Sequence, residues 1–288
     1  MVACPSLPAP RASLRPVARA AVHGAELYWA EVGVGRPCLV MHGGPGVDHT
    51  CFRPWLDRLG DVLRLVYYDH RGNGRSSRPP WETFTLAQLA ADADALCTHL
   101  GRDRTAVLGH SFGGIVALEY ALRYPERLAH LILVGSAAAF DYWDEVDANL
   151  RRKDAPPGAR AAWGIAPADD AAMAENARAT APLYFHRYDE ALAEQLFADV
   201  VFSAEASRRG SGLVQGYDAT ARLRAVRVPT LVLVGRDDFI APPSQAERLR
   251  AAIPGADLVV FVRSGHHPYA EEPDAFARTV RDWLARVG

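Results

Sequence analysis

The sequence predicts an α/β protein in which helices flank a mostly parallel central sheet and an inserted helical cap interrupts the chain. Short apolar segments alternate with amphipathic segments over most of the sequence, and this alternation is typical of parallel sheets covered on both faces. The length of 288 residues suits one large α/β domain or one domain with an insertion. We expect the core to comprise residues 17–135 and 226–288, and the cap to comprise residues 136–225.

The strands and helices of the core are predicted from local periodicity. Short apolar runs bounded by turn residues predict strands, and apolar residues that recur every three or four positions predict helices. Two segments that flank His23-Gly24-Ala25 predict an N-terminal hairpin at residues 17–22 and 26–32. Further strands are expected at residues 37–42, 63–69, 105–108, 128–134, 230–234 and 258–262. Helices are expected at residues 51–59, 85–100, 244–252 and 273–287, and between Ser111 and Tyr124, where Pro125 disfavours continuation.

The pattern changes between residues 136 and 225, where helical periodicity prevails without a strong strand. This segment is rich in Ala, Asp, Glu and Arg, and we expect its helices to break at Pro156-Pro157, Pro167 and Pro182. It is therefore predicted to be the cap. Residues 1–16 are rich in Pro, Ala and Arg and lack the apolar core of a secretory signal, so we expect a flexible lead-in.

Composition limits the partners and the compartment that we expect. The net charge of -2 without a basic cluster disfavours nucleic acid, and no apolar run is long enough for a membrane span. We therefore expect a small-molecule substrate, with neither nucleic acid nor membrane as a partner; the sequence carries no signal of an oligomeric state. Cys4, Cys38, Cys51 and Cys97 have no paired spacing, which favours reduced, structural thiols in a cytoplasmic protein without a metal site.

The strongest functional signal is the Gly-x-Ser-x-Gly pattern formed by Gly109, Ser111 and Gly113. It lies between an apolar strand and a helix whose Ile115 and Leu118 share one face. A strand that turns abruptly into a helix crowds the corner residue, and glycines two positions to either side relieve the clash. The corner places Ser111 at the C-terminal edge of the sheet, beside a helix N-terminus that favours developing negative charge. We predict that Ser111 is a nucleophile.

A serine nucleophile requires a base, and the base requires an orienting acid; in this architecture the chain order is serine, acid, histidine. Asp238, three residues after Gly235 at the end of a predicted strand, is the expected acid. Asp237 is the neighbouring alternative, and both aspartates could instead cap the following turn. His266 is the expected base because it follows a glycine after the next strand, and His267 is the alternative or a residue of the pocket wall.

The oxyanion of a tetrahedral intermediate requires two donors that point to one position. We expect one to be the backbone N–H of Phe112. The other is expected to be the N–H of Gly44, in a loop where Gly43 and Gly44 allow a close approach of the backbone. Pro45 has no N–H and stiffens this loop. His42 is expected to brace it.

These residues together resemble the α/β-hydrolase family from about residue 17 to the C-terminus. The loop His42-Gly43-Gly44-Pro45-Gly46 is similar to the HGGPG loop of the proline iminopeptidase group of serine peptidases, and residues 69–76 are similar to its D-x-R-G-x-G-x-S loop. The Gly235-x-x-Asp238 motif and residues 264–266, followed by 271–273, also fit this group. The resemblance implies a serine aminopeptidase that releases an N-terminal residue, often proline, from short peptides or amides, with no metal or organic cofactor.

The resemblance also implies acidic side chains in the cap that hold the free α-amine of the substrate. The Trp-Glu pair that is frequent in that group is not matched, because Trp163 is followed by Gly164. Glu175, Glu205 and Asp170 are candidate substitutes.

Two further histidines have expected positions in the structure, and two other classes of function remain open. His110 is expected to pack beneath the serine, and His186 to lie on the cap surface or to line a pocket. Because the HGGPG loop also occurs in hydrolases of esters and amides, the alternative is a carboxylesterase, lactonase or carbon–carbon bond hydrolase with the same triad; a non-catalytic binding scaffold is a third hypothesis. The predicted substrate-binding residues are Gly43, His110, Trp163, Glu175, Glu205 and His267.

Overall fold

The computed structural model describes residues 18–288, so the lead-in predicted over residues 1–16 and Cys4 lie outside the described residues. The described strands form one sheet of eight in the order β1-β2-β4-β3-β5-β6-β7-β8. β1 pairs with β2 and β2 with β4 in antiparallel fashion, whereas all other neighbours pair in parallel, which confirms the predicted fold class. The strands are β1 (Ala18–Val22), β2 (Ala25–Val32), β3 (Arg36–Met41), β4 (Leu63–Tyr68), β5 (Thr105–His110), β6 (Leu128–Val134), β7 (Thr230–Gly235) and β8 (Asp257–Phe261).

Helices cover both faces of the sheet, which explains why its central strands are mostly apolar. Every residue of β5 and β7 is buried, as expected for parallel strands between two helical layers. One layer contains α1 (Leu86–His99), α2 (Phe112–Arg123) and α8 (Pro243–Ala252). The other contains α10 (Pro273–Val287) and the 3₁₀-helices η1 (His49–Phe52) and η2 (Leu56–Leu59).

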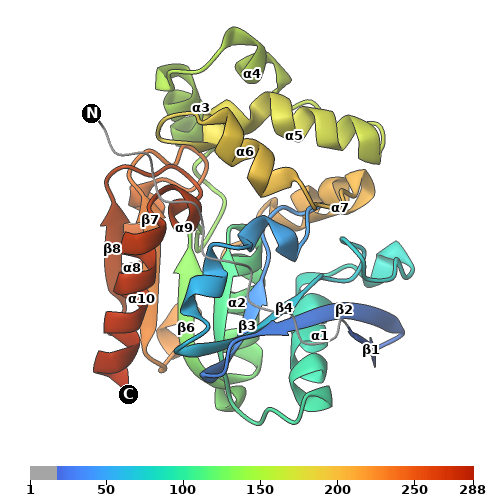
Figure 1. Cartoon of the computed structure of the whole chain (residues 1–288), viewed down its shortest axis with the longest axis vertical. Helices are drawn as coiled ribbons and strands as arrows, with labels where there is room; N and C mark the ends of the chain where they lie inside the picture. The colour runs from blue at the N-terminus through green and yellow to red at the C-terminus, as the bar shows by residue number, and fades with distance from the viewer. Residues whose placement is uncertain (1–17) are drawn as a thin grey trace.

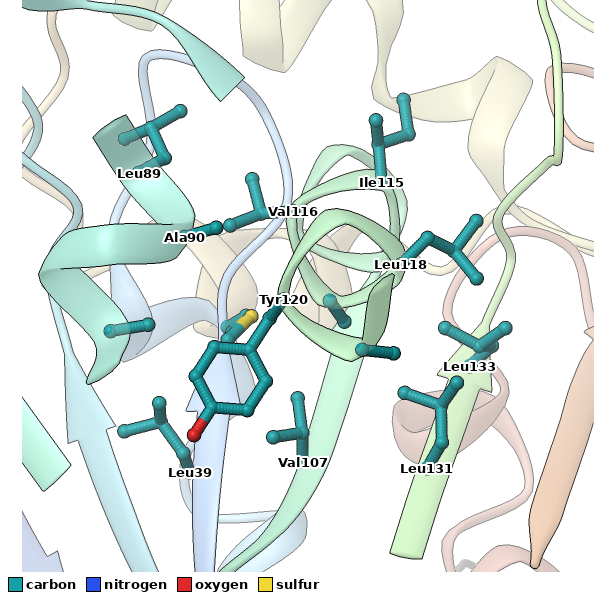
Figure 2. Close-up of a cluster of buried hydrophobic side chains, with 14 of the residues drawn as sticks. Leu39, Leu89, Ala90, Val107, Ile115, Val116, Leu118, Tyr120, Leu131 and Leu133 are labelled. Carbon is teal, nitrogen blue, oxygen red and sulfur yellow. The ribbon is translucent and has the colours of Figure 1, made fainter. Parts of the chain in front are cut away.

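The packing of α2 fixes the position of the residue at its N-terminus. Figure 2 shows Leu39, Val107 and Leu131, from three neighbouring strands, in one buried cluster with Ile115 of α2 and Leu89 of α1. All five side chains are almost fully buried. Because β5 and α2 are both held by this cluster, the turn between them, which carries Ser111, has a fixed place at the edge of the sheet.

The segment between β6 and β7, which we call the cap, contains five α-helices, all within the described residues. They are α3 (Trp143–Arg152), α4 (Pro157–Ala162), α5 (Asp170–Tyr184), α6 (Glu190–Phe197) and α7 (Ala204–Val214). Figure 1 shows the cap gathered over the end of the sheet at which the parallel strands finish. In sheets of this kind, ligands bind at that end.

Three local features differ from the prediction. Residues 51–59 form no single helix but belong to η1 and η2, because Pro54 lies between the two. Pro182 does not break a helix; it lies inside α5, two residues before the end at Tyr184, so only one helix hydrogen bond is lost. The short helix α9 (Pro268–Glu271) is absent from the prediction.

The described cysteines behave as predicted. Cys38, Cys51 and Cys97 are free and buried. Burial raises the pKa of the Cys38 thiol to about 12 and that of Cys97 to about 11, so both remain protonated at neutral pH. None of the helices within residues 18–288 is long and apolar enough to cross a membrane.

Candidate active site

Ser111 occupies the tight turn between β5 and α2, in a backbone conformation that is rare for a residue with a side chain. Its φ is 54° and its ψ is -120°. A Cβ atom at Gly113 would lie 2.2 Å from the Met41 carbonyl oxygen, so this close approach requires glycine. The turn is held by a hydrogen bond of 2.9 Å from the Ser111 N–H to the Val134 carbonyl and by one of 2.9 Å from Ser136 Oγ to the Ser111 carbonyl. These contacts keep the strained residue in place.

Asp238 and His266 form a buried pair at the same edge of the sheet. Asp238 Oδ2 lies 2.7 Å from His266 Nδ1, and the two residues are 2% and 3% exposed. The other carboxylate oxygen accepts hydrogen bonds from the N–H groups of Ile240 and Ala241, at 3.1 and 2.9 Å. Because a carboxylate only accepts, Nδ1 of His266 carries the hydrogen and Nε2 is left to accept a proton.

The alternative acid and base have other partners. The Asp237 carboxylate is hydrogen-bonded to His186 Nδ1 rather than to His266. His267 Nδ1 lies 3.1 Å from the Tyr269 hydroxyl, and its ring stacks on Tyr184 with 6.0 Å between centroids. Burial lowers the pKa of His267 well below its usual range. The geometry thus pairs Asp238 with His266 and places Asp237 and His267 beside that pair.

His110, the residue before Ser111, and Gly135 both lie against the Asp238–His266 pair. The His110 ring lies 4.6 Å from the His266 ring, and its Nε2–H donates to the His266 carbonyl at 2.9 Å. A Cβ atom on Gly135 would lie 3.1 Å from both Asp238 Oδ2 and His266 Nδ1. Ser111 Oγ itself is hydrogen-bonded to no group among the described residues. Hydrogen bonds between a nucleophile and its base are often unformed before substrate binds.

His42 fixes the orientation of the loop that contains Gly44. Its Nε2 accepts the His70 N–H at 3.0 Å, so the hydrogen is on Nδ1, which donates to the Gly43 carbonyl at 2.8 Å. The Gly43 carbonyl and the Gly44 N–H belong to one trans peptide and point in opposite directions. Holding the carbonyl therefore directs the Gly44 N–H to the other side. A Cβ on Gly43 would lie 3.2 Å from Ser111 Cβ, which places this loop directly beside the serine.

The backbone N–H groups of Gly44 and Phe112 are available for an oxyanion. Neither donates a hydrogen bond to another group in the described part of the chain. The Phe112 N–H belongs to the first residue of α2, where helix N–H groups have no partner within the helix. These two N–H groups are the same donors that the sequence predicts for binding an oxyanion.

The loop of Gly43–Gly46 is held between the core and the cap. The Gly46 N–H donates to Asn73 Oδ1 at 2.8 Å, and the Gly46 carbonyl accepts the Ser203 N–H at 2.9 Å. A Cβ on Gly210 of α7 would lie 2.0 Å from Pro45 Cγ. The cap therefore packs directly on this loop, and Asn73, in the loop of residues 69–76, supports it from the core.

Asp48, His49 and Asp69 are a buried group with ligand atoms within 4.8 Å of one another. Their carboxylates are already bound by protein donors. Asp69 Oδ1 lies 2.6 Å from His49 Nδ1 and its Oδ2 accepts the Arg75 N–H at 2.8 Å. Asp48 Oδ1 accepts the Thr50 N–H, and its Oδ2 accepts from Arg75 Nη1 at 2.7 Å. The group is thus a hydrogen-bonded support for neighbouring loops rather than a set of unused metal ligands.

Trp163 belongs to an aromatic group beside His266. Its ring lies 4.9 Å from that of Phe239 and 6.1 Å from that of Tyr184, and the Tyr184 ring lies 5.5 Å from that of His266. Burial raises the pKa of Tyr184, which therefore stays neutral. The cap side chain that contacts the His266 ring is therefore aromatic and uncharged.

The acidic residues that were candidates for binding an amine lie elsewhere or have partners. Glu205 is paired with Arg209 at 2.7 Å and also with Arg208. Asp170 is paired with Arg78 at 3.1 Å, and its other oxygen accepts the Ala204 N–H. Glu175 is exposed, two positions from the buried Met173 that contacts the Gly46 loop. Side chains two positions apart point to different faces of a helix, so Glu175 faces away from that loop.

Sequence reasoning assigned no role to Gly135 or Asn73. Gly135 lies directly after β6 with a φ of 50°. Its position as a glycine at the end of a predicted strand is the signal from which a role could have been expected. Asn73 lies in the quoted motif of residues 69–76, but its partner Gly46 is 27 positions away, so spacing alone gave no indication of the contact.

Comparison with known proteins places this geometry in a family. The family of the alpha/beta hydrolase fold matches residues 37–273. The chain is 30% identical over 280 residues to the 2-hydroxy-6-oxo-2,4-heptadienoate hydrolase of Pseudomonas putida, which covers 91% of this chain and 94% of that protein. It is 27% identical over 281 residues to proline iminopeptidase PfmaB of Pestalotiopsis fici, covering 92% and 98%. The solved structure of a thermophilic esterase from Thermogutta terrifontis has a TM-score of 0.74 at 30% identity, covering 96% and 99%. The chain therefore belongs to the α/β-hydrolase fold family.

Proposed function

We propose that the protein is a serine hydrolase in which Ser111 is the nucleophile, His266 the base and Asp238 the residue that orients it. The observation that carries this proposal is the buried hydrogen bond of 2.7 Å between Asp238 and His266, whose ring lies 4.6 Å from that of His110, the residue before Ser111. Asp238 fixes the ring tautomer of His266 and stabilises the imidazolium that forms when His266 takes up a proton.

The reaction proceeds in two halves. Ser111 Oγ attacks the carbonyl carbon of the substrate while His266 Nε2 takes its proton, and the N–H groups of Gly44 and Phe112 stabilise the resulting oxyanion. His266 then gives its proton to the leaving group, which leaves an acyl group on Ser111. In the second half, water attacks the acyl carbon, His266 takes the proton of that water, and the proton passes to Ser111 Oγ as the acid product departs.

The preferred substrate is an ester or another acyl compound without a cationic amine near the reacting bond. Two of the acids considered for amine binding, Glu205 and Asp170, are paired with arginine, and Glu175 is exposed. The side chains beside His266 on the cap are aromatic. An aminopeptidase is the second candidate, which the HGGPG loop and the likeness to proline iminopeptidase PfmaB favour.

Labelling and a substrate panel test the proposal. A fluorophosphonate probe is expected to label the wild type and to leave Ser111→Ala unlabelled, while Ser111→Ala keeps its thermal stability. A wild type that is not labelled would contradict the assignment of Ser111. Turnover of p-nitrophenyl acetate is then compared with that of prolyl and alanyl p-nitroanilides. Faster hydrolysis of the anilides, abolished by blocking their amine, would favour the aminopeptidase instead.

A further inference from the structure

Glu271, the last residue of α9, lies where the loop of His266 meets the cap, and its carboxylate is bonded to both. Oε1 accepts the N–H of Gly265, the residue before His266, at 2.7 Å. Oε2 accepts the N–H of His186, which follows α5 in the cap, at 2.7 Å. One carboxylate oxygen therefore binds the loop of His266, and the other binds the cap.

The rest of this junction consists of backbone in close contact. The His266 N–H donates to the Tyr184 carbonyl at 2.6 Å. A Cβ atom on Gly265 would lie 2.3 Å from the same carbonyl oxygen, so the two segments are too close for a side chain between them. A displacement of residues 184–186 would consequently move the backbone of His266.

We propose that Glu271 is a positioning residue of the hydrolase: by joining Gly265 to His186 it holds the His266 imidazole in place and ties that place to the cap. The proposal rests on the proposed role of His266 as the base. Two N–H donors converge on this side chain, and an ionised carboxylate can accept from both. A protonated carboxyl or a glutamine amide would present a hydrogen to one of the two donors and lose that bond.

The hydrogen bonds of Glu271 to Gly265 and His186 therefore depend on the protonation state of its carboxyl group. Burial raises the pKa of this carboxyl to about 7, although the backbone N–H groups of His186, Gly265 and His267 and, less strongly, the Lys153 ammonium at the end of α3 oppose the shift. Lys153 Nζ donates to the Asp237 carbonyl at 3.0 Å, and the Asp237 carboxylate is bonded to the His186 ring. On its own helix, Glu271 is near the neutral Tyr269 and, at the helix N-cap, His267. As pH falls through about 7, Glu271 takes up a proton and one of its two hydrogen bonds is lost.

Two substitutions and a matched control test this role. Glu271→Gln and Glu271→Ala are compared with Glu247→Gln, which removes an exposed charge paired with Arg250 on α8. With p-nitrophenyl acetate, both Glu271 variants are expected to lose about tenfold to a hundredfold in kcat with little change in KM, because a base displaced by a fraction of an ångström is less well aligned. Glu247→Gln is expected to keep the wild-type kcat.

The pH profile separates positioning from a general structural effect. Below neutral pH, log kcat/KM of the wild type is expected to fall more steeply than that of Glu271→Gln, because only the wild type loses the Glu271 bridge by protonation. In Glu271→Gln this additional pH dependence is absent. Hydrogen exchange gives a readout that is independent of turnover: the Gly265 and His186 amides are protected in the wild type, and one of the two exchanges faster in Glu271→Gln.

Two failures are distinguishable. A wild type that neither hydrolyses the ester nor reacts with a fluorophosphonate refutes the proposed function, and the amide exchange still tests the bridge. An active wild type whose kcat, acid slope and amide protection are all unchanged in Glu271→Gln refutes the role of Glu271. If Glu271→Ala does not fold, the decision rests on Glu271→Gln.

Discussion

Replacing Gly135 with alanine would place a methyl group against the hydrogen bond on which the proposed function depends. The new Cβ would lie 3.1 Å from Asp238 Oδ2, 3.1 Å from His266 Nδ1 and 3.2 Å from His266 Cε1. Contacts this short require the neighbours to move by a few tenths of an ångström. Because both partners of the bond are displaced, we expect kcat to fall by about tenfold to a hundredfold. The φ of 50° also makes alanine strained here, which lowers the free energy of unfolding by roughly 1–2 kcal/mol.

The control for this experiment is Gly101→Ala. Gly101 has a φ of 64°, so alanine is similarly strained, but its Cβ would meet no atom within 4 Å. Both variants are assayed for kcat with p-nitrophenyl acetate and for unfolding in urea. We expect a loss of stability in both, larger in Gly135→Ala because its methyl group also displaces buried neighbours, and a loss of kcat in Gly135→Ala alone. Equal kcat values in the two variants would refute the idea that the Asp238–His266 bond limits turnover.

Three further predictions concern the same end of the sheet. Ser111→Gly is expected to abolish turnover and to raise the free energy of unfolding by about 1 kcal/mol, because glycine tolerates a positive φ; a urea titration showing a loss of stability would contradict this. His42→Phe removes the donor to the Gly43 carbonyl, so kcat measured with p-nitrophenyl acetate is expected to fall by about a hundredfold while the thermal midpoint changes less; an unchanged kcat would show that the Gly44 N–H needs no brace. Burial lowers the pKa values of His70, His110 and His267, so the unfolded chain binds protons that the folded chain does not, and stability falls as pH drops below about 6.5 by up to about 1.4 kcal/mol per pH unit for each histidine. Thermal midpoints between pH 7.5 and 5 check this, and a midpoint that rises on acidification would contradict it.

The sequence predicts best those features that depend on neighbouring residues. The predicted strand at residues 128–134 is β6 (Leu128–Val134), and the helix after Ser111 ends at Arg123, next to Tyr124 as the position of Pro125 predicts. The preference for Asp238 over Asp237 came from the spacing after Gly235, and the geometry pairs Asp238 with His266. Strand ends and tight turns are local, and the parallel sheet brings them to one edge.

The helical character of the cap could be predicted from the sequence, but its contacts with the core could not. The pairing of Glu205 with Arg208 and Arg209 is local, at helical spacing, and could have been expected from the sequence. Asp170 and Arg78 are 92 positions apart, and Glu271 and His186 are 85 positions apart. Contacts over such separations depend on how the cap is placed on the core, which no periodicity encodes.

Three hydrogen bonds attach the cap to the reactive loops through its main chain, beside side-chain contacts such as that of the His186 ring with Asp237. The Tyr184 carbonyl bonds to the His266 N–H, and the N–H groups of His186 and Ser203 bond to Glu271 and to the Gly46 carbonyl. Main-chain groups are present whatever the side chain is. Cap side chains outside the contacts described above can therefore change while these main-chain anchors of the base and of the oxyanion loop stay where they are. Relatives at 27–30% identity bear the names of a heptadienoate hydrolase, a proline iminopeptidase and an esterase, as expected where one fold hosts several activities.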